Sequence, residues 1–363
     1  MNRTSLLLNE YSRLGTALGS FRGAQAPLRF DDPRLEYQAV RQAAGFFDYT
    51  FRARYSATGS DRVRFLHSMV SNDVKSLTAG QGTYALLLDA RGHILADLRI
   101  YAAADHLLLE FDAAWAEKAL AALNYYNVGG RVPITSVEGA AISFQGPRAR
   151  ALLEASLEAA LPPLAAHQYA VAPFHGASAF VARVDSTGVE GYEAFVADES
   201  FAALWQAAIR HAPDFSARPC GTEALEMLRI EAGIPAYGSD LGEDTLPLEA
   251  GLLNAVSFTK GCYIGQEIVE RARSRGRVNW KLVGFLPERE AAVGEKFTAD
   301  GREVGELTSV VFSPALGRTI ALGYARREFA EPGKTLALPG GGTATVAALP
   351  FVDGGSAAPS APA

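Results

Sequence analysis

The segment from residue 260 to residue 267, Lys-Gly-Cys-Tyr-Ile-Gly-Gln-Glu, carries the strongest type of nucleophile in the chain. Cys262 is one of two cysteines in 363 residues, and Lys260 stands just ahead of it. Residues 268–275 predict a helix that Gly276 ends. A helix N-terminus carries a partial positive charge, and positive surroundings favour a thiolate over a thiol. We therefore expect Cys262 to present a reactive sulfur, or a ligand for a metal or cluster, on a tightly turned loop.

The structural alternative is that Cys262 packs as a small buried hydrophobic residue, as free cysteines often do. With only Cys220 as a second cysteine, the chain has no disulfide framework, which suits a reducing cytoplasm. One chain also cannot supply the four cysteine ligands of an iron–sulfur cluster. The histidines show no metal-ligand spacing, so we predict no resident metal site.

A second group of reactive side chains lies on one face of the strand predicted over residues 94–101. Strand side chains alternate between two faces, and here one face is entirely apolar. The other face carries Asp97, Arg99 and Tyr101 beside Leu95. An acid, a base and a phenol on one face are unusual for a core strand and are compatible with a binding or catalytic surface, although the pattern alone favours a solvated face. The alternative is a solvated sheet face, which antiparallel sheets often have.

Arg229 is the third unusual residue. Thr222 begins a predicted helix over residues 222–232, and Gly233 ends it. Arg229 falls inside the apolar arc of this helix, where an unpaired buried charge is costly. We expect either a structural salt bridge or contact with an anionic or polar edge of a ligand.

The composition and length indicate the class of protein that positions these residues. Hydrophobic content of 48% and charged content of 20% are typical of a globular protein, and the length suggests two or three domains. A net charge of −6 argues against a broad nucleic-acid-binding surface, so no direct nucleic-acid partner is expected. No apolar run reaches the ~18 residues of a membrane span, and no signal peptide is apparent. We predict a cytoplasmic protein.

Residues 260–267 resemble the signature Lys-Gly-Cys-aromatic-x-Gly-Gln-Glu of the folate-binding YgfZ-type family, relatives of the glycine-cleavage aminomethyltransferase. The matching residues are Lys260, Gly261, Cys262, Tyr263, Gly265, Gln266 and Glu267. Further similar segments follow in order and spacing: Gly59-Ser-Asp61, Phe65-Leu66, Asn72-Asp73, Gly82-x-Tyr84, Gln145-Gly146-Pro147, Gly191-Tyr192-Glu193 and Leu228-Arg229-x-Glu231-Ala-Gly233. The resemblance covers roughly residues 40–350.

The resemblance implies an α+β fold: an aminomethyltransferase-like ring of three domains, with ferredoxin-like α/β layers and a small C-terminal β-barrel. It also implies that tetrahydrofolate, or a one-carbon derivative of it, is the cofactor. Asp97 then matches the acid near the reactive nitrogens of the folate. Tyr84 and Tyr101 match residues that line the folate site. Glu193 matches the acid that holds the pterin ring, and Arg229 matches the arginine beside it.

We expect four parts along the chain. Residues 1–135 form an N-terminal α+β region that binds folate, and residues 136–279 form a second α+β region that ends with the cysteine motif. Residues 280–353 contain short strands separated by Gly/Pro turns, the pattern of a small barrel. Residues 354–363 have the composition of a disordered tail. Near the N-terminus, residues 6–18 predict a single helix.

Two positions depart from the aminomethyltransferase pattern. Val189 follows Thr187-Gly188 where those enzymes resemble one another in having an acid, and Asp112 stands where they have asparagine. The enzyme also lacks the Cys262 motif. We therefore favour the YgfZ-type function: a folate-dependent factor that assembles or repairs [4Fe–4S] proteins, including radical enzymes that modify tRNA. Cys262 and Asp97 are the predicted catalytic residues, and iron–sulfur client or assembly proteins are the predicted partners.

Two other functions remain open. The first is a true folate-dependent aminomethyltransferase, or a related one-carbon transferase, in which Asp97 orients or activates a folate nitrogen. The second is a non-enzymatic RNA-associated module, suggested by alternating arginines after the motif at positions 271, 273, 275 and 277. Such a run is usually a solvated helix face, and the negative net charge makes this the weakest hypothesis.

Overall fold

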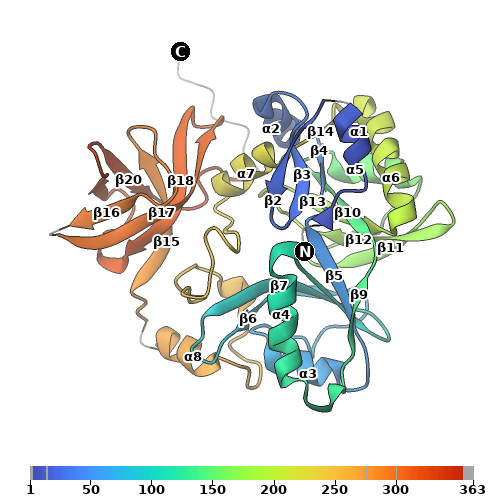
Figure 1. The fold of residues 1–363 in the computed structure, drawn as a ribbon, viewed down its shortest axis with the longest axis horizontal. Coiled ribbons are helices and arrows are strands. Elements are labelled where there is room, and N and C mark those ends of the chain that lie inside the picture. The colour runs from blue at the N-terminus through green and yellow to red at the C-terminus, as the bar shows by residue number, and fades with distance from the viewer. Residues whose placement is uncertain (1–2, 14, 275, 300, 355–363) are drawn as a thin grey trace. The chain divides into compact units, whose positions relative to one another are not determined.

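The computed structural model describes residues 3–13, 15–274, 276–299 and 301–354, and most of its elements are labelled in Figure 1. The chain divides into two compact units, each assembled from separate segments. The first unit comprises Met1–Asp89, Leu95–Leu225 and Asn254–Ile264. The second comprises Ala90–Ile94, Glu226–Leu253 and Gly265–Ala363.

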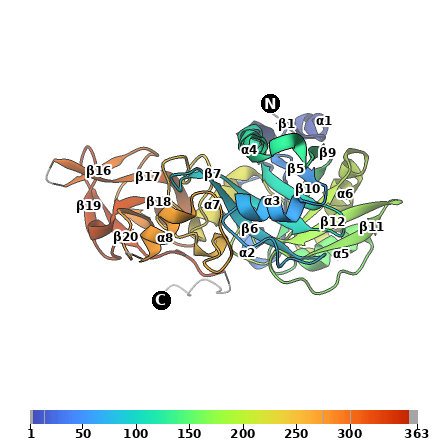
Figure 2. The same cartoon turned by 90° about the horizontal axis from the view of Figure 1, so that it is seen from below.

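One sheet of the first unit has five strands in the order β6-β7-β8-β5-β9. Their bounds are β6 Gly82–Leu88, β7 Ile94–Ala102, β8 Leu107–Asp112, β5 Arg52–Ala57 and β9 Ile134–Val137. Helices α3 (Arg62–Met69) and α4 (Ala113–Tyr126) contribute to the apolar core on one face of this sheet, and Figure 2 shows both beside it. The opposite face is therefore left for the polar residues of β7.

A second sheet of the first unit has six strands in the order β11-β12-β13-β10-β4-β14. The bounds are β11 Tyr169–Phe174, β12 Ala177–Arg183, β13 Gly191–Val196, β10 Ala140–Gln145, β4 Gly45–Asp48 and β14 Arg218–Pro219. Helices α5 (Ala149–Leu157) and α6 (Asp198–His211) pack on it around the fully buried Trp205. Glu193, in the central strand β13, pairs with Ser143 of β10 and Ala182 of β12.

The N-terminal segment corrects the prediction of a single helix over residues 6–18. Helix α1 (Leu8–Arg13) ends early, and Gly15 adopts a positive φ of 69° that a helix cannot contain. Strand β2 (Ala17–Phe21) then pairs antiparallel with β3 (Ala24–Arg29), which also pairs with β1 (Arg3–Thr4). Gly15 and the β2–β3 hairpin have therefore replaced the last part of the predicted helix.

Helix α2 (Pro33–Gln42) was not predicted, although the sequence holds its start signals. The Asp32 side chain caps the helix by accepting from the Arg34 N–H, and Pro33 occupies the first turn. Glu36 is fully buried and accepts from the backbone N–H groups of Phe30 and Gly221. This carboxylate ties together segments of the first unit that are distant in sequence.

The second unit contains the C-terminal barrel. Its sheet order is β16-β17-β18-β15-β20-β19, and the edge strands β16 and β19 are in contact, so the barrel is nearly closed. The bounds are β16 Lys296–Ala299, β17 Arg302–Ser313, β18 Arg318–Arg326, β15 Trp280–Pro287, β20 Thr343–Ala347 and β19 Thr335–Ala337. Phe285 and Phe297 stack in its core with ring centroids 4.7 Å apart. The predicted α+β class with a small C-terminal barrel is confirmed.

Two helices adjoin the predicted site residues. Helix α7 (Thr222–Glu231) carries Arg229, and α8 (Gln266–Ser274) begins four residues after Cys262 in the chain. Short 3-10 turns occur at Val128–Gly130, Ala212–Phe215, Leu253–Ala255 and Arg327–Phe329. Apart from Gly354, the tail predicted over residues 354–363 lies outside the described residues. Within the part of the chain that the structure describes, no helix has the length and apolar character needed to cross a bilayer.

Candidate functional site

Asp97 lies on the polar face of β7, as the alternation predicted. The Tyr84 hydroxyl, from the neighbouring strand β6, donates to Asp97 Oδ2 at 3.1 Å. Burial raises the pKa of the Asp97 carboxyl, and the nearby charge of Asp112 raises it further, against the opposing effect of Arg52. The pKa of Tyr84 is also raised, because of burial and the adjacent Asp97. A carboxyl group in this setting can hold a proton where an exposed one would have lost it.

Arg99 lies two residues further along the same face and joins the two main sheets. Its Nη1 donates to Glu110 Oε1 of β8 at 2.8 Å and to Glu193 Oε1 of β13 at 2.8 Å. Glu110 and Glu193 are fully buried, whereas the side chain of Arg99 is 15% exposed. The polar face of β7 is therefore a buried ionic network, and the solvated sheet face considered above is not what the structure contains.

Glu110 is the centre of this network. Arg52 Nε donates to its Oε1 at 3.1 Å, and Arg54 Nε donates to its Oε2 at 2.7 Å. Arg54 lies directly opposite Glu110 in the register of β5 and β8. Burial disfavours the ionised carboxylate, but Arg54, Arg52 and Arg99 outweigh it and hold the pKa of Glu110 far below its usual range. Glu110 is thus a permanent negative charge between three arginines.

Asp112, one of the two departures from the family pattern, belongs to the same network. Its Oδ1 accepts from Arg52 Nη1 at 2.5 Å, and its Oδ2 lies 3.6 Å from Arg22 Nη1. The extra charge that Asp112 brings is therefore matched by two arginines. This pairing explains how the chain accommodates an acid at this position without leaving a buried charge unpaired.

Several buried polar atoms in or beside the network have no hydrogen-bond partner within the described residues, among them Arg54 Nη1, Glu193 Oε2 and the Tyr101 hydroxyl. Burial, as the largest cause, raises the pKa of Glu193, and Arg99 only partly opposes it. The Tyr101 ring is held edge-on against Tyr169 and Phe180. Buried polar groups nearly always have partners, so Glu193 Oε2 and the Tyr101 hydroxyl are suited to a ligand that brings its own donors and acceptors.

The cysteine motif lies on a loop that Lys260 fastens to the first unit. The Lys260 ammonium donates to the backbone carbonyls of His67, Val70 and Asn72, the last two at 2.6 and 3.0 Å. It also lies 5.0 Å from the centroid of the Tyr263 ring. Burial lowers the pKa of Lys260 to about 8. Lys260 therefore acts as an anchor of the loop.

Cys262, by contrast, is exposed, so the alternative of a small buried residue does not hold. Its loop connects to the Asp97 region through two hydrogen bonds. Asn72, whose carbonyl accepts from Lys260, donates through Nδ2 to the backbone carbonyl of Tyr84 at 2.8 Å. Residues 260–264 of the motif and the strand that carries Tyr84 are thus parts of one hydrogen-bonded assembly within the first unit.

Arg229 makes all its recorded contacts inside the second unit. Its Nη1 donates to Asp240 Oδ2 at 2.9 Å, its Nη2 donates to the Ser309 hydroxyl at 2.9 Å, and its Nε donates to Glu226 at 2.8 Å. Burial disfavours the charge, but Glu226 and Asp240 outweigh it and raise the pKa of Arg229. The structural salt bridge is therefore present, and a role for Arg229 in ligand binding remains a prediction.

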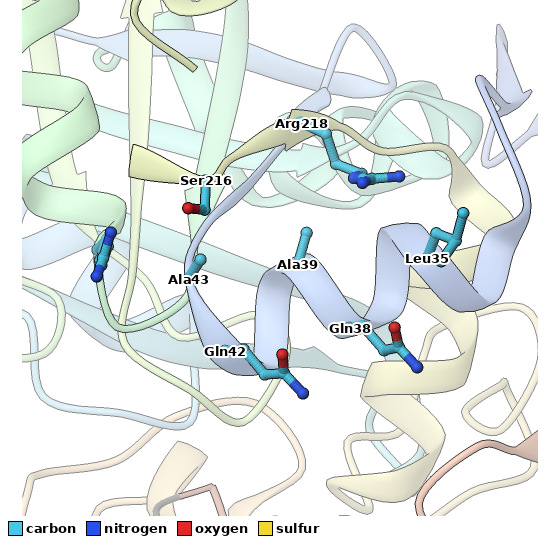
Figure 3. Close-up of a pocket in the computed structure, with 8 residues that line it drawn as sticks. Leu35, Gln38, Ala39, Gln42, Ala43, Ser216 and Arg218 are labelled. Carbon is cyan, nitrogen blue, oxygen red and sulfur yellow. The ribbon is translucent and has the colours of Figure 1, made fainter. Parts of the chain in front are cut away.

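A surface cavity of about 310 Å³ lies in the first unit, away from the predicted residues. Figure 3 shows Gln38 and Gln42 of α2 on one side of it, with Ser216 and Arg218 opposite. Arg218 is paired with Asp31 at 3.4 Å. None of the eight lining residues is among the predicted site residues. Within the described residues, no group of three or more metal-ligating side chains could hold a metal ion.

The sequence analysis missed Arg52, Arg54 and Glu110, which hold the network together. A signal was available. Residues 52 and 54 share one strand face by alternation, and Glu110 interrupts the apolar run of β8. Only the pairing of β5 with β8, however, brings these charges together.

Comparison with known proteins gives a consistent result over nearly the whole chain. The model of the GCVT N-terminal domain family matches residues 7–260, and that of the glycine cleavage T-protein C-terminal barrel domain matches residues 281–353. The aminomethyltransferase of Geobacillus sp. (strain WCH70) is 32% identical over 338 residues, covering 91% of this chain and 92% of that protein. The aminomethyltransferase of Rubrobacter xylanophilus is 34% identical over 327 residues, covering 89% of this chain and 87% of that protein.

Among solved structures, the glycine cleavage system aminomethyltransferase T from Bartonella henselae has a TM-score of 0.88 against this chain. The two are 26% identical, and the match covers 97% of this chain and 99% of that one.

Proposed function

Because the chain belongs to the glycine-cleavage T-protein (aminomethyltransferase) family, we propose that it binds tetrahydrofolate in its first unit and transfers a one-carbon group to or from that cofactor. Tetrahydrofolate is the one-carbon carrier of this family, and its ring nitrogens supply the atoms that accept or release the unit. Among the functions considered from the sequence, the transferase is favoured by the relatives that the chain matches.

The observation that carries the proposal is the pair of orphaned buried atoms, Glu193 Oε2 and the Tyr101 hydroxyl, beside the strand that carries Asp97. A pterin ring presents N–H and amine donors along one edge, and a carboxylate oxygen without a partner is a suitable acceptor for them. Glu193 would hold the ring by that edge, and Tyr84 and Tyr101 would line the site. The residues present therefore fit the cofactor.

Asp97 has the properties of the residue that exchanges a proton with the folate. Its pKa is raised by burial and by Asp112, which brings the carboxyl closer to the range where an acid–base group works at neutral pH. The Tyr84 hydroxyl holds Oδ2 at 3.1 Å and so fixes the orientation of the carboxyl group. In this proposal Asp97 orients the folate nitrogen or moves a proton at it.

Two assays with the purified protein test this function. Tetrahydrofolate should bind, and an aminomethyl or methylamine donor should be turned over with it. Asp97→Asn should lower kcat about 10²–10⁴-fold, the usual contribution of a positioned acid–base group, while the folate dissociation constant changes by only a few-fold. Turnover that survives unchanged in Asp97→Asn would remove Asp97 from the chemistry, and no turnover with any donor would count against the transferase function.

The exposed Cys262 favours a second candidate function: a folate-binding factor for assembly or repair of [4Fe–4S] proteins, including radical enzymes that modify tRNA. The thiol is accessible, and its loop is tied through Lys260 and Asn72 to the backbone of Tyr84. This arrangement would place a nucleophilic sulfur on the same assembly as the folate site. Iron–sulfur client or assembly proteins would then be the partners.

A cellular experiment separates the two functions. The gene is deleted and replaced by the wild type or by Cys262→Ser, and one [4Fe–4S] radical enzyme is assayed beside glycine-cleavage flux. If the serine form fails to support the cluster enzyme and glycine cleavage is normal, the thiol carries the function. If glycine cleavage falls on deletion and the serine form restores it, the protein acts as a one-carbon transferase.

A further inference from the structure

Arg99 bonds carboxylates of the two main sheets of the first unit to one another at the candidate site. Its Nη1 donates at 2.8 Å to Glu110 Oε1, which belongs to the same sheet as Arg99 itself. The same nitrogen donates at 2.8 Å to Glu193 Oε1, which belongs to the other sheet. One guanidinium nitrogen thus fixes a carboxylate of β13 relative to the strand that carries Asp97.

The contacts of Glu193 are unequal between its two oxygens. Oε1 accepts from Arg99 and from the Ser186 hydroxyl, the latter at 3.2 Å. Oε2 is equally buried and accepts nothing from the described residues. Two donors on one oxygen set the rotation of the carboxylate, and they leave the other oxygen desolvated and available. A buried acceptor that receives no hydrogen bond costs free energy, so this arrangement favours binding of a ligand that supplies a donor.

Arg99 is itself held rigidly. Glu110 is fully buried and also accepts from Arg52 and Arg54, so its ionised form is strongly stabilised. An anchor that stays charged keeps Arg99 in place whether or not Glu193 is ionised. The network therefore separates two tasks: Glu110 holds the arginine, and the arginine directs Glu193.

We propose that Arg99 is a positioning residue, which sets the separation and orientation of Asp97 and Glu193 and so determines how tightly the folate ring is held between them. The inference rests on the proposed function, since it takes tetrahydrofolate as the ligand of both carboxyl groups. Arg99 acts through Glu193 and needs no contact with the ligand.

A double-mutant cycle on tetrahydrofolate affinity tests the inference. Arg99→Met should weaken binding about 10–100-fold, the range for losing a hydrogen bond to a charged group. In a Glu193→Gln background, the same substitution should weaken binding less than about threefold, because the group through which it acts is already changed. Arg99→Lys keeps the charge and should recover part of the affinity, and it replaces Arg99→Met in the cycle if the methionine form does not fold.

Arg150→Met is the control, because Arg150 pairs with Glu154 on α5 at 3.0 Å and lies outside the network of Glu110 and Glu193. Its folate affinity should stay within about threefold of the wild type, whatever the change in its melting temperature. Unchanged affinity in the folded Arg99 variants, or losses that simply add in the double mutant, would overturn the positioning role and leave the proposed function intact. A wild-type protein that binds no tetrahydrofolate would overturn the proposed function and, with it, this inference.

Discussion

Arg99 in the first unit and Arg229 in the second are both arginines held by carboxylates, yet their networks end differently. Around Arg229 the contacts return to one another: Ser309 accepts from Arg229 and donates to Asp240 Oδ1 at 2.7 Å, while Asp240 Oδ2 accepts from Arg229. Around Arg99 the network ends at Glu193 Oε2, which has no partner among the described residues.

This difference distinguishes a network that stabilises the fold from one that can bind a ligand. A buried ion pair whose every lone pair and proton is satisfied contributes order, and removing one partner leaves an uncompensated charge. A network that ends in an unsatisfied buried oxygen carries a cost that a ligand can relieve. Both arginines were predicted from the sequence to be special, and only the pattern of their hydrogen bonds distinguishes the two roles.

The largest expected effect is on stability and comes from the network around Arg229, in which the contacts return to one another. Arg229→Met leaves Asp240 buried without its counter-charge and should lower the free energy of unfolding by about 3–5 kcal/mol, measured by denaturant unfolding. Arg271→Met, at an exposed position of α8, is the control and should stay within about 0.5 kcal/mol of the wild type. If Arg229→Met instead keeps its stability and loses folate affinity, Arg229 contacts the ligand and the comparison fails.

The next effect is on folate binding and comes from the network around Arg99, which ends at Glu193 Oε2. Glu193→Gln keeps the shape of the side chain but removes the charge that faces the ligand. We expect tetrahydrofolate affinity to fall by about 1.5–3 kcal/mol, or roughly 10–100-fold, in calorimetric titration. Stability should change by less than about 1 kcal/mol, because Arg99 keeps Glu110 as its partner. A large loss of stability with normal affinity would make Glu193 a structural residue like Asp240.

Lys260 is a half-buried cation whose ammonium donates to three carbonyl oxygens, as the guanidinium of Arg229 donates to carboxylates. Lys260→Met should lower the free energy of unfolding at pH 7 by about 1–3 kcal/mol, since those carbonyls lose their donor. The pKa of Lys260, about 8, is below its ordinary value of 10.5, so between these pH values the native protein binds fewer protons than the unfolded chain. The wild type should therefore gain stability as pH rises through this window, and Lys260→Met should lack that gain.

The smallest expected effect is at Cys262, which is exposed and outside both networks. Cys262→Ser should change the free energy of unfolding by no more than about 0.5 kcal/mol and leave folate affinity within a few-fold. Thermal unfolding and titration of the same preparation measure both. Cys220→Ser, at a fully buried position, provides the contrast and should destabilise the protein measurably. A serine form of Cys262 that melts early would show that the motif is structural.

Local patterns were enough to predict the elements that carry the site. Alternation along residues 94–101 predicted the polar face of β7, and the cap and stop residues of α7 predicted that helix closely. The short strands after residue 280 predicted the barrel. These features depend on neighbours within a few positions, where periodicity and turn chemistry determine the conformation.

The partners of the site residues could not be predicted in the same way. Arg52 meets Glu110 across 58 positions, and Arg99 meets Glu193 across 94. Such contacts follow from strand order and register, which no local pattern records. The helix predicted over residues 6–18 ends early for a local reason: Gly15 adopts a positive φ, and residues 17 and 18 enter the β2–β3 hairpin.

The anchor formed by Lys260 has a consequence for how the chain is made. Its ammonium bonds to the carbonyl of His67, which precedes it by 193 positions, and residues 254–264 belong to the first unit. A ribosome adding about 5–20 residues per second needs roughly 10–40 s to cover that interval. The loop that joins α3 to β6 is therefore synthesised long before Lys260, the cation that bonds to its carbonyl oxygens. Folding of the first unit can be completed only after residue 264 has been synthesised, so most of its strands wait for the segment of residues 254–264.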